Sequence, residues 1–413
     1  MSRAAALPSS CADDQFRLAI AGPILTQPLA ELLEGAADRL PAGVGGASSV
    51  VWQLVGDLVS RGRRVSVVTL DESVSTPVTA GGPLLDLTYG PYRPRHRMRD
   101  LMRVERHAVR DGVLRVRPAL VHAHWCCEYA LGAFAGGIPT LVTVHDWVPM
   151  ILRLTEARDR PHWWGRALLY FTTLARARHL TAVSPYTAQK VRHFTRAAVE
   201  VVPNGVADAA FAPEAKGPGR RASGGRPVII SVNSGFGPRK NVHRLLEACS
   251  SLRQRGIACE LHLVGDGYEP AGPCEAWARQ RRLAEGVTFV GPCDRAEVLR
   301  RMGAAMLLAH PSREESFGMT LIEAMSQRVP VIGGARAGAV PWVLGGGRAG
   351  LLTDAEDPRA LARAMEAVLT QETLRKRLAV DGYARAWRDF RQSQVTDLYL
   401  RAYRRVLAEE ARR

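Results

Sequence analysis

The stretch His310–Gly334, HPSREESFGMTLIEAMSQRVPVIGG, decides the fold of this chain. An apolar run, Ala304–Ala309, precedes it and is typical of a strand buried in a parallel sheet. After a loop, a helix is expected to begin near Thr320, and the next strand begins at Val331. The stretch therefore predicts a strand–loop–helix–strand unit of an α/β protein, in which ligands bind beyond the carboxyl ends of the strands.

The loop of this unit suits an anionic ligand that carries hydroxyl groups. Gly318 permits close approach of the backbone to a ligand, and the free N–H groups around Met319–Ile322 favour phosphate. Glu315 and Glu323 lie in the loop and in the first helical turn, so both carboxylates can face one set of sugar hydroxyls. A second interpretation stays open, because Thr320 and Glu323 match a capping box and Glu315 alone fits a solvated loop charge.

A glycine-rich segment occurs near the start of the chain. Gly43, Gly45 and Gly46 precede a helix expected at about Val50–Arg61. Glycines before a helix commonly receive phosphate or a substrate hydroxyl. Ordinary turns are built in the same way, so the cluster indicates a site only together with other motifs.

Polar side chains also follow two expected strands, Leu120–Ala123 and Thr140–Val144. The first strand runs into His124, and the second runs into His145 and Asp146. Such positions lie at the ligand-binding edge of a parallel sheet. A single histidine at a strand end is otherwise more often structural.

Arg239 and Lys240 stand at a loop–helix junction after the strand expected at Pro227–Val232. A lysine point charge and an arginine fork together can neutralise a diphosphate. The alternative is a plain basic helix start, although cations are disfavoured at a helix N-terminus unless an anion is bound.

The run E-S-F-G-M-T-L-I-E-A-M, followed by V-P-V-I-G, resembles the E-x7-E signature of retaining glycosyltransferases of family 4. The glycine loop G-V-G-G-A-S, the H-D pair at 145, P-N-G-V at 203 and V-G-D-G at 264 resemble further motifs of this family. The resemblance implies an α/β fold of the GT-B type, with two Rossmann-like domains facing each other across a cleft and a C-terminal helix crossing back to the first domain. The implied organisation is a loose tail at 1–15, an acceptor-side domain at 16–210, a linker at 211–226, a nucleotide-sugar domain at 227–390 and the final helix at 391–413.

The resemblance also implies roles for individual residues. The residues implied to be catalytic are His145, Glu315 and Lys240. The donor would be bound by Arg239, Lys240, Gly265, Glu315, Phe317, Gly318, Met319, Thr320, Leu321 and Glu323. The acceptor side would include Gly45, Gly46, His124 and Asp146. One departure is that the arginine usual in the family directly after the first strand of the second domain is replaced here, at about Ser234.

The implied reaction moves a sugar from a nucleoside-diphosphate sugar, UDP- or GDP-linked, to a hydroxyl of a polysaccharide, a lipid-linked glycan or another glycoconjugate intermediate. The anomeric configuration would be retained. The chain has no convincing Asp-x-Asp motif, so we expect no metal and no cofactor beyond the donor substrate. A glycoside phosphorylase or a nucleotide-sugar epimerase using the same cleft remains an alternative.

The overall composition limits the classes of partner that we expect. A net charge of +16 indicates anionic partners such as nucleotide-sugar phosphates, acidic lipid surfaces or nucleic acid. We expect no nucleic-acid partner, because no recognition helix or stacking motif is recognisable. Seven scattered cysteines without C-x-x-C spacing fit a reduced cytoplasmic protein without structural zinc.

Two segments suggest peripheral contact with the inner face of an acidic membrane. Arg93–Arg117 carries nine arginines against three acidic residues, and its central part, Met98–Val113, is compatible with a helix. Trp163 and Trp164 suit a lipid interface or an acceptor groove. A solvated face of an arginine-rich protein explains the first segment equally well. No apolar run reaches the ~18 residues that a membrane span needs.

Overall fold

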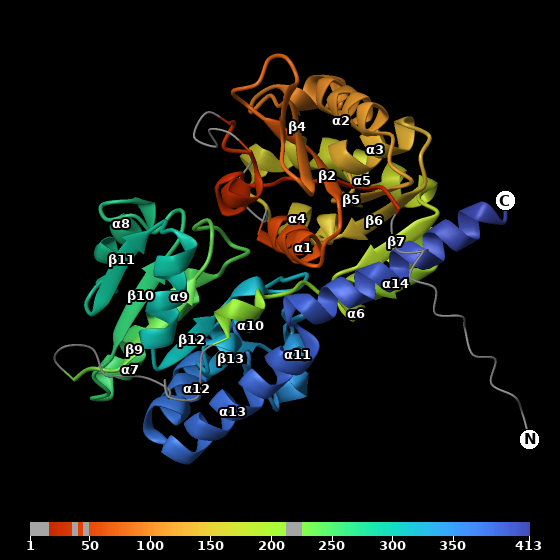
Figure 1. The fold of residues 1–413 in the computed structure, drawn as a ribbon. Helices are drawn as coiled ribbons and strands as arrows, with labels where there is room; N and C mark the ends of the chain where they lie inside the picture. Colours follow the sequence, from red (N-terminus) through yellow and green to blue (C-terminus); the bar gives the residue numbers. More distant parts are fainter. Residues whose placement is uncertain (1–15, 35–39, 44–48, 212–224) are drawn as a thin grey trace, which may run out of the picture. The chain divides into compact units, whose positions relative to one another are not determined.

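The computed structural model describes residues 16–34, 40–43, 49–211 and 225–413 (Figure 1). The predicted tail at 1–15 and most of the predicted linker at 211–226 lie outside these ranges. Gly45 and Gly46 lie outside them as well. The predicted domain boundaries therefore stay a prediction.

The first sheet has eight strands, in the order β3-β4-β2-β1-β5-β6-β7-β8. The strands are β1 (Leu18–Ala21), β2 (Val65–Asp71), β3 (Val78–Gly81), β4 (Leu85–Pro91), β5 (Leu120–His124), β6 (Thr140–Val144), β7 (His179–Ala182) and β8 (Val199–Val201). β3 pairs with β4 in the antiparallel sense, whereas β1, β2, β4 and β5 pair in parallel. The residues of β1, β2 and β5 are buried along the whole length of each strand, as expected of strands covered on both faces.

The helices that accompany this sheet are α1 (Ser49–Ser60), α2 (Arg103–Val116), α3 (Glu128–Ala135), α4 (Val148–Leu154), α5 (Arg160–Arg176) and α6 (Pro185–Val191). A glycine sets the close packing of α2 against α3. A Cβ atom at Gly132 would lie only 2.6 Å from the Cβ of Val109, so the helices could not approach this closely with a larger residue. Ser184 caps α6 by accepting a hydrogen bond from the backbone N–H of Thr187, with Pro185 at the first helical position.

The second sheet has six parallel strands, in the order β11-β10-β9-β12-β13-β14. The strands are β9 (Val228–Val232), β10 (Glu260–Val264), β11 (Val287–Gly291), β12 (Leu307–His310), β13 (Val331–Gly334) and β14 (Leu351–Thr353). The helices are α7 (Val242–Gln254), α8 (Pro273–Gln280), α9 (Arg295–Ala304), α10 (Met319–Ser326), α11 (Val340–Val343), α12 (Pro358–Thr370), α13 (Glu372–Asp389) and α14 (Gln392–Ala411). The shorter 3-10 helices of the chain are Gln27–Leu32, Arg97–Asp100, Ala157–Asp159, Arg192–Phe194, Asp208–Ala210 and Gly345–Gly347.

Two hydrophobic clusters cover the second sheet. One cluster joins the strands to buried residues of α7, α8 and α12, and the other joins them to α9, α10, α11 and α13. A parallel sheet with a helical layer on both faces is the doubly wound arrangement. Together with the first sheet, it confirms the prediction of two Rossmann-like α/β domains.

By their internal contacts the residues form two compact units. The first unit comprises Met1–Thr143, Ala177–His179 and Leu400–Arg413, and the second comprises Val144–Arg176 and Leu180–Tyr399. The end of α14 therefore belongs to the first unit. There, the Tyr403 hydroxyl lies 2.7 Å from Nδ1 of the buried His122.

The predicted secondary structure is close to the observed one, with two corrections. β6 has the predicted bounds. The helix predicted at Met98–Val113 begins only at Arg103, because Leu101 and Met102 adopt left-handed conformations with φ of 52° and 57°. The strand predicted from Ala304 begins at Leu307, because α9 continues through Ala304.

Candidate active site

Lys240 and Glu315 form an ion pair at the carboxyl edge of the second sheet. Lys240 lies between β9 and α7, and Glu315 lies in the loop between β12 and α10. Lys240 Nζ donates a hydrogen bond of 2.6 Å to Glu315 Oε1, and both side chains are about nine-tenths buried (13% and 12% exposed). Nε2 of His310 lies 3.2 Å from the same oxygen. The two residues that the sequence assigned to one site are therefore in direct contact.

The electrostatics of this cluster favour the ionised carboxylate of Glu315. Burial alone would raise the pKa of Glu315. Lys240, the His310 side chain and Arg239 outweigh this effect and hold the pKa well below its usual range. Glu315 is thus a carboxylate that can accept hydrogen bonds from sugar hydroxyls, and the cations around it form a positively charged environment for phosphate.

Glu323 is held by an arginine that the sequence did not single out. Arg295, the first residue of α9, donates a hydrogen bond of 2.6 Å from Nη1 to Glu323 Oε1. The helix α10 begins at Met319, after Gly318 with φ of 94°, and no side chain caps its N-terminus. The capping-box interpretation is therefore wrong, because the carboxylate of Glu323 is turned to Arg295. The hydroxyl of Thr320 lies 3.4 Å from His310 Nδ1 instead.

Backbone contacts hold the loop that carries Glu315. The Ala339 N–H donates a hydrogen bond of 2.8 Å to the Glu315 carbonyl, and a Cβ atom at Gly338 would clash with this carbonyl. The amide of Asn241, which follows Lys240, donates hydrogen bonds to the carbonyls of Pro311 (3.0 Å) and Ala355 (2.7 Å). The loop is thereby fixed to the neighbouring loops of the same sheet edge.

Gly265 follows β10 and brings two of these loops together. Its φ is 119°, and a Cβ atom there would clash with the carbonyl of Asn233. Its own N–H donates to the Gly291 carbonyl at 2.8 Å. Only glycine fits such a close approach of backbone to backbone.

The segment that carries His145 borders the Glu315 loop within the second unit. The backbone N–H of Trp147 donates a hydrogen bond of 3.2 Å to the Ser316 hydroxyl. The hydroxyl of Ser184 donates a hydrogen bond of 2.6 Å to the Ser316 carbonyl. His145 itself is buried, with 7% of its surface exposed. Asp146 accepts a hydrogen bond at its carbonyl from the Tyr170 hydroxyl, at 2.9 Å, which fixes this turn.

Glu314 is a second buried carboxyl group that sequence analysis missed. Its Oε2 accepts a hydrogen bond of 3.1 Å from the Tyr186 hydroxyl, and its side chain is only 3% exposed. Burial raises the pKa of Glu314 to about 7, with the neighbouring Glu315 adding to the rise while Tyr186, Arg239 and Lys190 oppose it. The doublet Glu314-Glu315 was the available signal, since one loop rarely buries two acids without a purpose.

The remaining predicted site residues have different surroundings. The side chains of Phe317 and Leu321 are buried in the core, where the Phe317 ring packs against Phe390 with centroids 5.5 Å apart. Only their backbones can face a ligand. Ser234, where the family arginine is missing, donates a hydrogen bond of 2.8 Å to Asp266. The donor roles of these residues stay predictions.

The predicted acceptor-side residues fall in several places. His124 belongs to the first unit and is buried, with its ring 4.1 Å from that of His122. Burial lowers the pKa of His124 to about 3, so its ring is neutral. Gly45 and Gly46 lie outside the described residues, whereas the N–H of Gly43 donates a hydrogen bond of 2.7 Å to Asp71.

The described ranges contain neither a metal-binding cluster nor a membrane-spanning helix. In these ranges, no group of three or more His, Cys, Asp or Glu residues is arranged to hold a metal ion. None of the helices described combines the length and the apolar character that crossing a membrane requires.

Comparisons with known proteins were made for the whole chain. The family model Glycosyltransferase Family 4 matches residues 44–209, and the model Glycosyl transferases group 1 matches residues 217–385. The D-inositol 3-phosphate glycosyltransferase of Mycolicibacterium gilvum is 26% identical over 93% of this chain and 88% of its own length. That of Nocardioides sp. is 29% identical over 70% of this chain and 68% of its own length.

Solved structures share the fold at lower identity. Sucrose-phosphate synthase from Thermosynechococcus elongatus superposes with a TM-score of 0.75 at 21% identity, over 96% of this chain and 100% of that structure. HepE of Anabaena, solved in complex with UDP-glucose, gives a TM-score of 0.66 at 16% identity, over 96% and 99%. The two family models account for most of the chain, one for each sheet, and they agree with the fold and with the loop motifs. The chain belongs to the GT-B glycosyltransferases of family 4, the glycosyl transferases of group 1.

Proposed function

We propose that this glycosyltransferase moves a sugar from a UDP- or GDP-linked donor to a hydroxyl of a glycan or lipid-linked acceptor, with retention of the anomeric configuration. The observation that carries the proposal is the buried cluster of Lys240, Glu315 and His310 at the carboxyl edge of the second sheet. HepE, a relative in fold, was solved with UDP-glucose. The curated relatives act on D-inositol 3-phosphate, which is a phosphorylated polyol acceptor.

The donor diphosphate replaces Glu315 as the partner of Lys240 in this proposal. The Lys240 ammonium then binds the diphosphate, and Arg239 acts from the same loop. The released carboxylate of Glu315 accepts hydrogen bonds from the hydroxyls of the sugar. His310, whose Nε2 lies 3.2 Å from Glu315 Oε1, stays beside the carboxylate when Lys240 turns to the diphosphate.

The nucleoside is bound by the second carboxylate. Glu323, oriented by Arg295 at 2.6 Å, accepts hydrogen bonds from the two ribose hydroxyls. The backbone N–H groups of the first turn of α10 face the phosphates. Gly318, with φ of 94°, directs the chain into that turn without a side chain in the way.

Stabilisation of the negative charge on the leaving diphosphate lowers the barrier of the reaction. The bond between the anomeric carbon and the diphosphate oxygen breaks, and its electron pair leaves with the diphosphate. The acceptor oxygen forms its bond to the same face of the carbon, and its proton passes to the leaving diphosphate. Lys240, Arg239 and the helix N-terminus stabilise the charge that develops on the diphosphate, without a metal ion. His145 is proposed to contact the sugar, because its segment borders this loop through the Trp147 N–H and the Ser316 hydroxyl.

A ligand panel tests the proposal. Calorimetry and thermal unfolding are measured with UDP-, GDP-, ADP- and TDP-sugars, without metal. One nucleotide is expected to raise the melting temperature, because a ligand that binds only the folded state stabilises it by about 2.7 kcal/mol at 100 times its Kd. Glu323→Gln should lose most of this shift, whereas Glu285→Gln, an exposed control, should keep it. The absence of any shift, or an equal shift in Glu323→Gln, would contradict the assignment.

Turnover assays then separate the remaining alternatives. Retention is read from the anomeric configuration of the first product formed with the identified donor. Consumption of a glycoside with inorganic phosphate in place of an acceptor would instead identify a phosphorylase. Interconversion of nucleotide sugars without an acceptor would identify an epimerase.

We also propose that the enzyme binds an acidic membrane surface and receives its acceptor there. Trp164 and Leu168 lie one turn apart on α5 and are 64% and 55% exposed. In the basic segment, Arg95, Arg99 and Arg103 are exposed, whereas Arg93 is bound to Asp100 and Glu105. An exposed tryptophan and a set of arginines suit an anionic lipid interface.

A further inference from the structure

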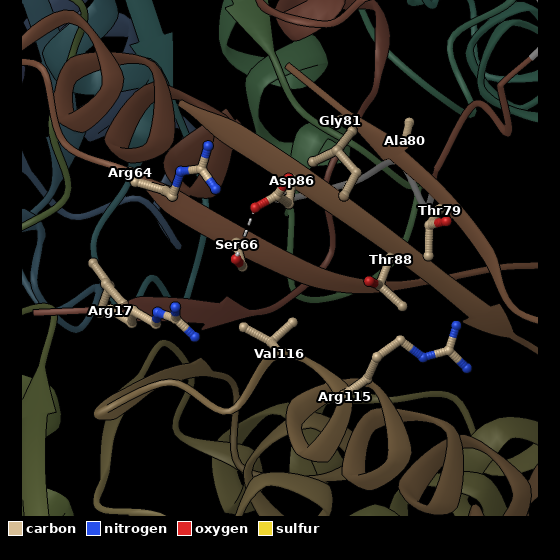
Figure 2. Close-up of a pocket in the computed structure, with 12 residues that line it drawn as sticks. Arg17, Arg64, Ser66, Thr79, Ala80, Gly81, Asp86, Thr88, Arg115 and Val116 are labelled. Carbon is tan, nitrogen blue, oxygen red and sulfur yellow. Dashed lines mark hydrogen bonds between the residues drawn. The ribbon is translucent and has the colours of Figure 1, made fainter. Parts of the chain in front are cut away.

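The first unit contains a hollow of about 520 Å³ at the amino ends of its parallel strands (Figure 2). It is lined by the starts of β1, β2 and β4, by the end of β3 and by the end of α2. The lining residues are Arg17, Leu18, Arg64, Ser66, Thr79, Ala80, Gly81, Asp86, Leu87, Thr88, Arg115 and Val116. The volume is that of a pocket for a small molecule. The residues of the candidate active site named above as donor-binding all belong to the other unit.

The register of the sheet explains why the hollow exists. Ser66 pairs with Asp86, and Asp86 pairs with Gly81, so these residues form one row across three strands. One step further along the same face, α2 covers the sheet, and its Gly112 lies against Val68. Because α2 ends at Val116, the row around Asp86 is left without a helix above it.

The floor of the hollow is polar. Ser66 donates a hydrogen bond of 3.5 Å from its hydroxyl to Asp86 Oδ2, which is a long and weak bond. Thr88 lies two residues further along β4, on the same face as Asp86. Polar side chains on a sheet face of a buried strand need a partner. In the described part of the chain, the Ser66 hydroxyl is the side chain that supplies one to Asp86.

The rim of the hollow is positively charged. Arg17, Arg64 and Arg115 stand around it, all three exposed (Figure 2). Arg64 donates one hydrogen bond of 3.1 Å to the carbonyl of Pro83. Among the residues that the structure describes, none of the three arginines forms an ion pair. Three guanidinium groups against one carboxylate leave an excess of positive charge over a recess lined with hydroxyl groups.

We propose that this hollow binds a small phosphorylated polyol, such as a sugar phosphate, as a ligand separate from the transferred sugar and its donor. The guanidinium groups bind the phosphate, because their fork matches its oxygens. Asp86 accepts hydrogen bonds from the hydroxyls of the ligand, with Ser66 beside it and with Thr79 paired to Thr88 further along the strands. Asp86 also excludes a continuous polyanion, since a carboxylate in the floor repels a phosphate backbone that would fill the recess.

Calorimetry on the full-length protein tests this site with three probes: glucose 6-phosphate, inorganic phosphate and glucose. The wild-type protein is expected to bind the ester at least tenfold more tightly than either part. Arg115→Ala should weaken binding of the ester roughly tenfold, as the loss of a hydrogen bond to a charged group does. Asp86→Asn should reduce the affinity for the ester to that for inorganic phosphate. Arg103→Ala, an exposed arginine at the other end of the same helix, should leave binding of the ester unchanged.

A variant of the other unit separates this site from the donor site. Glu323→Gln should lose most of its binding of the nucleotide sugar and leave binding of glucose 6-phosphate unchanged. Arg115→Ala should weaken binding of glucose 6-phosphate roughly tenfold and leave binding of the nucleotide sugar unchanged. The proposal is overturned if the wild-type protein does not bind the ester at millimolar concentration. It is equally overturned if Arg115→Ala and Asp86→Asn both bind the ester as the wild type does, or if Lys240→Ala abolishes this binding.

Discussion

Arg295 Nη1 lies 2.6 Å from Glu323 Oε1, so the first residue of α9 fixes a carboxylate on α10. Glu323 is 6% exposed and needs a cationic partner when no ligand is bound. The pair therefore orients the carboxylate before the donor arrives. This makes Arg295 a positioning residue for the nucleoside.

Arg295→Ala is expected to weaken binding of the nucleotide sugar about tenfold, as is usual when a charged hydrogen bond is lost. The double variant Arg295→Ala/Glu323→Gln should lose little more than Glu323→Gln alone, because the arginine acts through the glutamate. Calorimetry with the identified nucleotide measures both. Arg300→Ala, at an exposed ion pair on the same helix, serves as the control. Losses that simply add in the double variant would contradict the positioning role.

Lys240→Ala is expected to lower kcat by a factor of about 100 or more, because it removes a preorganised charge from the leaving diphosphate. The melting temperature should fall as well, by the equivalent of about 3 kcal/mol, because Glu315 is left buried without its cation, so turnover is measured well below the unfolding transition of the variant. Turnover and thermal unfolding are measured on the same preparation. Lys376→Ala, which breaks an exposed pair with Glu372, controls for charge. Unchanged turnover would remove Lys240 from the mechanism.

Glu314 should make the stability of the protein depend on pH. Its pKa rises on folding from 4.5 to about 7, so the folded state keeps a proton that the unfolded chain releases. The free energy of unfolding should therefore fall as the pH rises through this range, by at most about 3 kcal/mol. Glu314→Gln should match the wild type near pH 4.5 and exceed it in stability at pH 8. Denaturant titrations at both pH values measure this, with the exposed Glu285→Gln as control. A constant difference between Glu314→Gln and wild type at all pH values would exclude the titration of Glu314.

Gly265→Ala should destabilise the protein by about 3 kcal/mol or more. Its φ of 119° and its contact with the Asn233 carbonyl leave no place for a Cβ atom. Gly237→Ala is the control in the neighbouring loop, since nothing lies within 4 Å of its Cβ position. Thermal unfolding compares the two variants. Equal melting temperatures would show that the loops can separate without cost.

Membrane contact is tested by sedimentation with vesicles of anionic lipid. Trp164→Ala/Leu168→Ala should reduce binding several-fold, because together they remove most of the exposed apolar surface of α5. Charge reversal at Arg95, Arg99 and Arg103 should abolish the dependence on salt. Val380→Ala, an exposed apolar residue on α13, is the control. If the same amount of protein sediments with the vesicles in all of these variants, the membrane proposal has no support.

The sequence predicts the strands well because parallel sheets are covered on both faces, so their strands read as apolar runs. β6 has the predicted bounds for this reason. The start of α2 was missed because Leu101 and Met102 adopt left-handed conformations that tertiary contacts impose on residues with no preference for them.

Within the site, the sequence predicts the residues but not their partners. The spacing of Glu315 and Glu323 placed both in one loop–helix segment, as observed. The partner of Glu323 is 28 residues away, in a different loop, and no local pattern relates the two positions. The pKa of Glu314 is raised mainly by burial and lowered in part by Tyr186, which lies 128 residues earlier and reaches it only after folding.

Because the first unit includes the C-terminal segment of the chain, it can complete its fold only when translation is nearly finished. Its final segment, Leu400–Arg413, supplies Tyr403 to the buried His122 and Glu410 to His179, at 2.7 Å and 2.9 Å. The ribosome must therefore synthesise all of Leu180–Tyr399 before these partners exist. During translation the second unit can complete its fold while the first waits for the side chains of Tyr403 and Glu410. Chaperones that hold nascent chains would thus meet the amino-terminal part of this enzyme for longer than the part that is made after it.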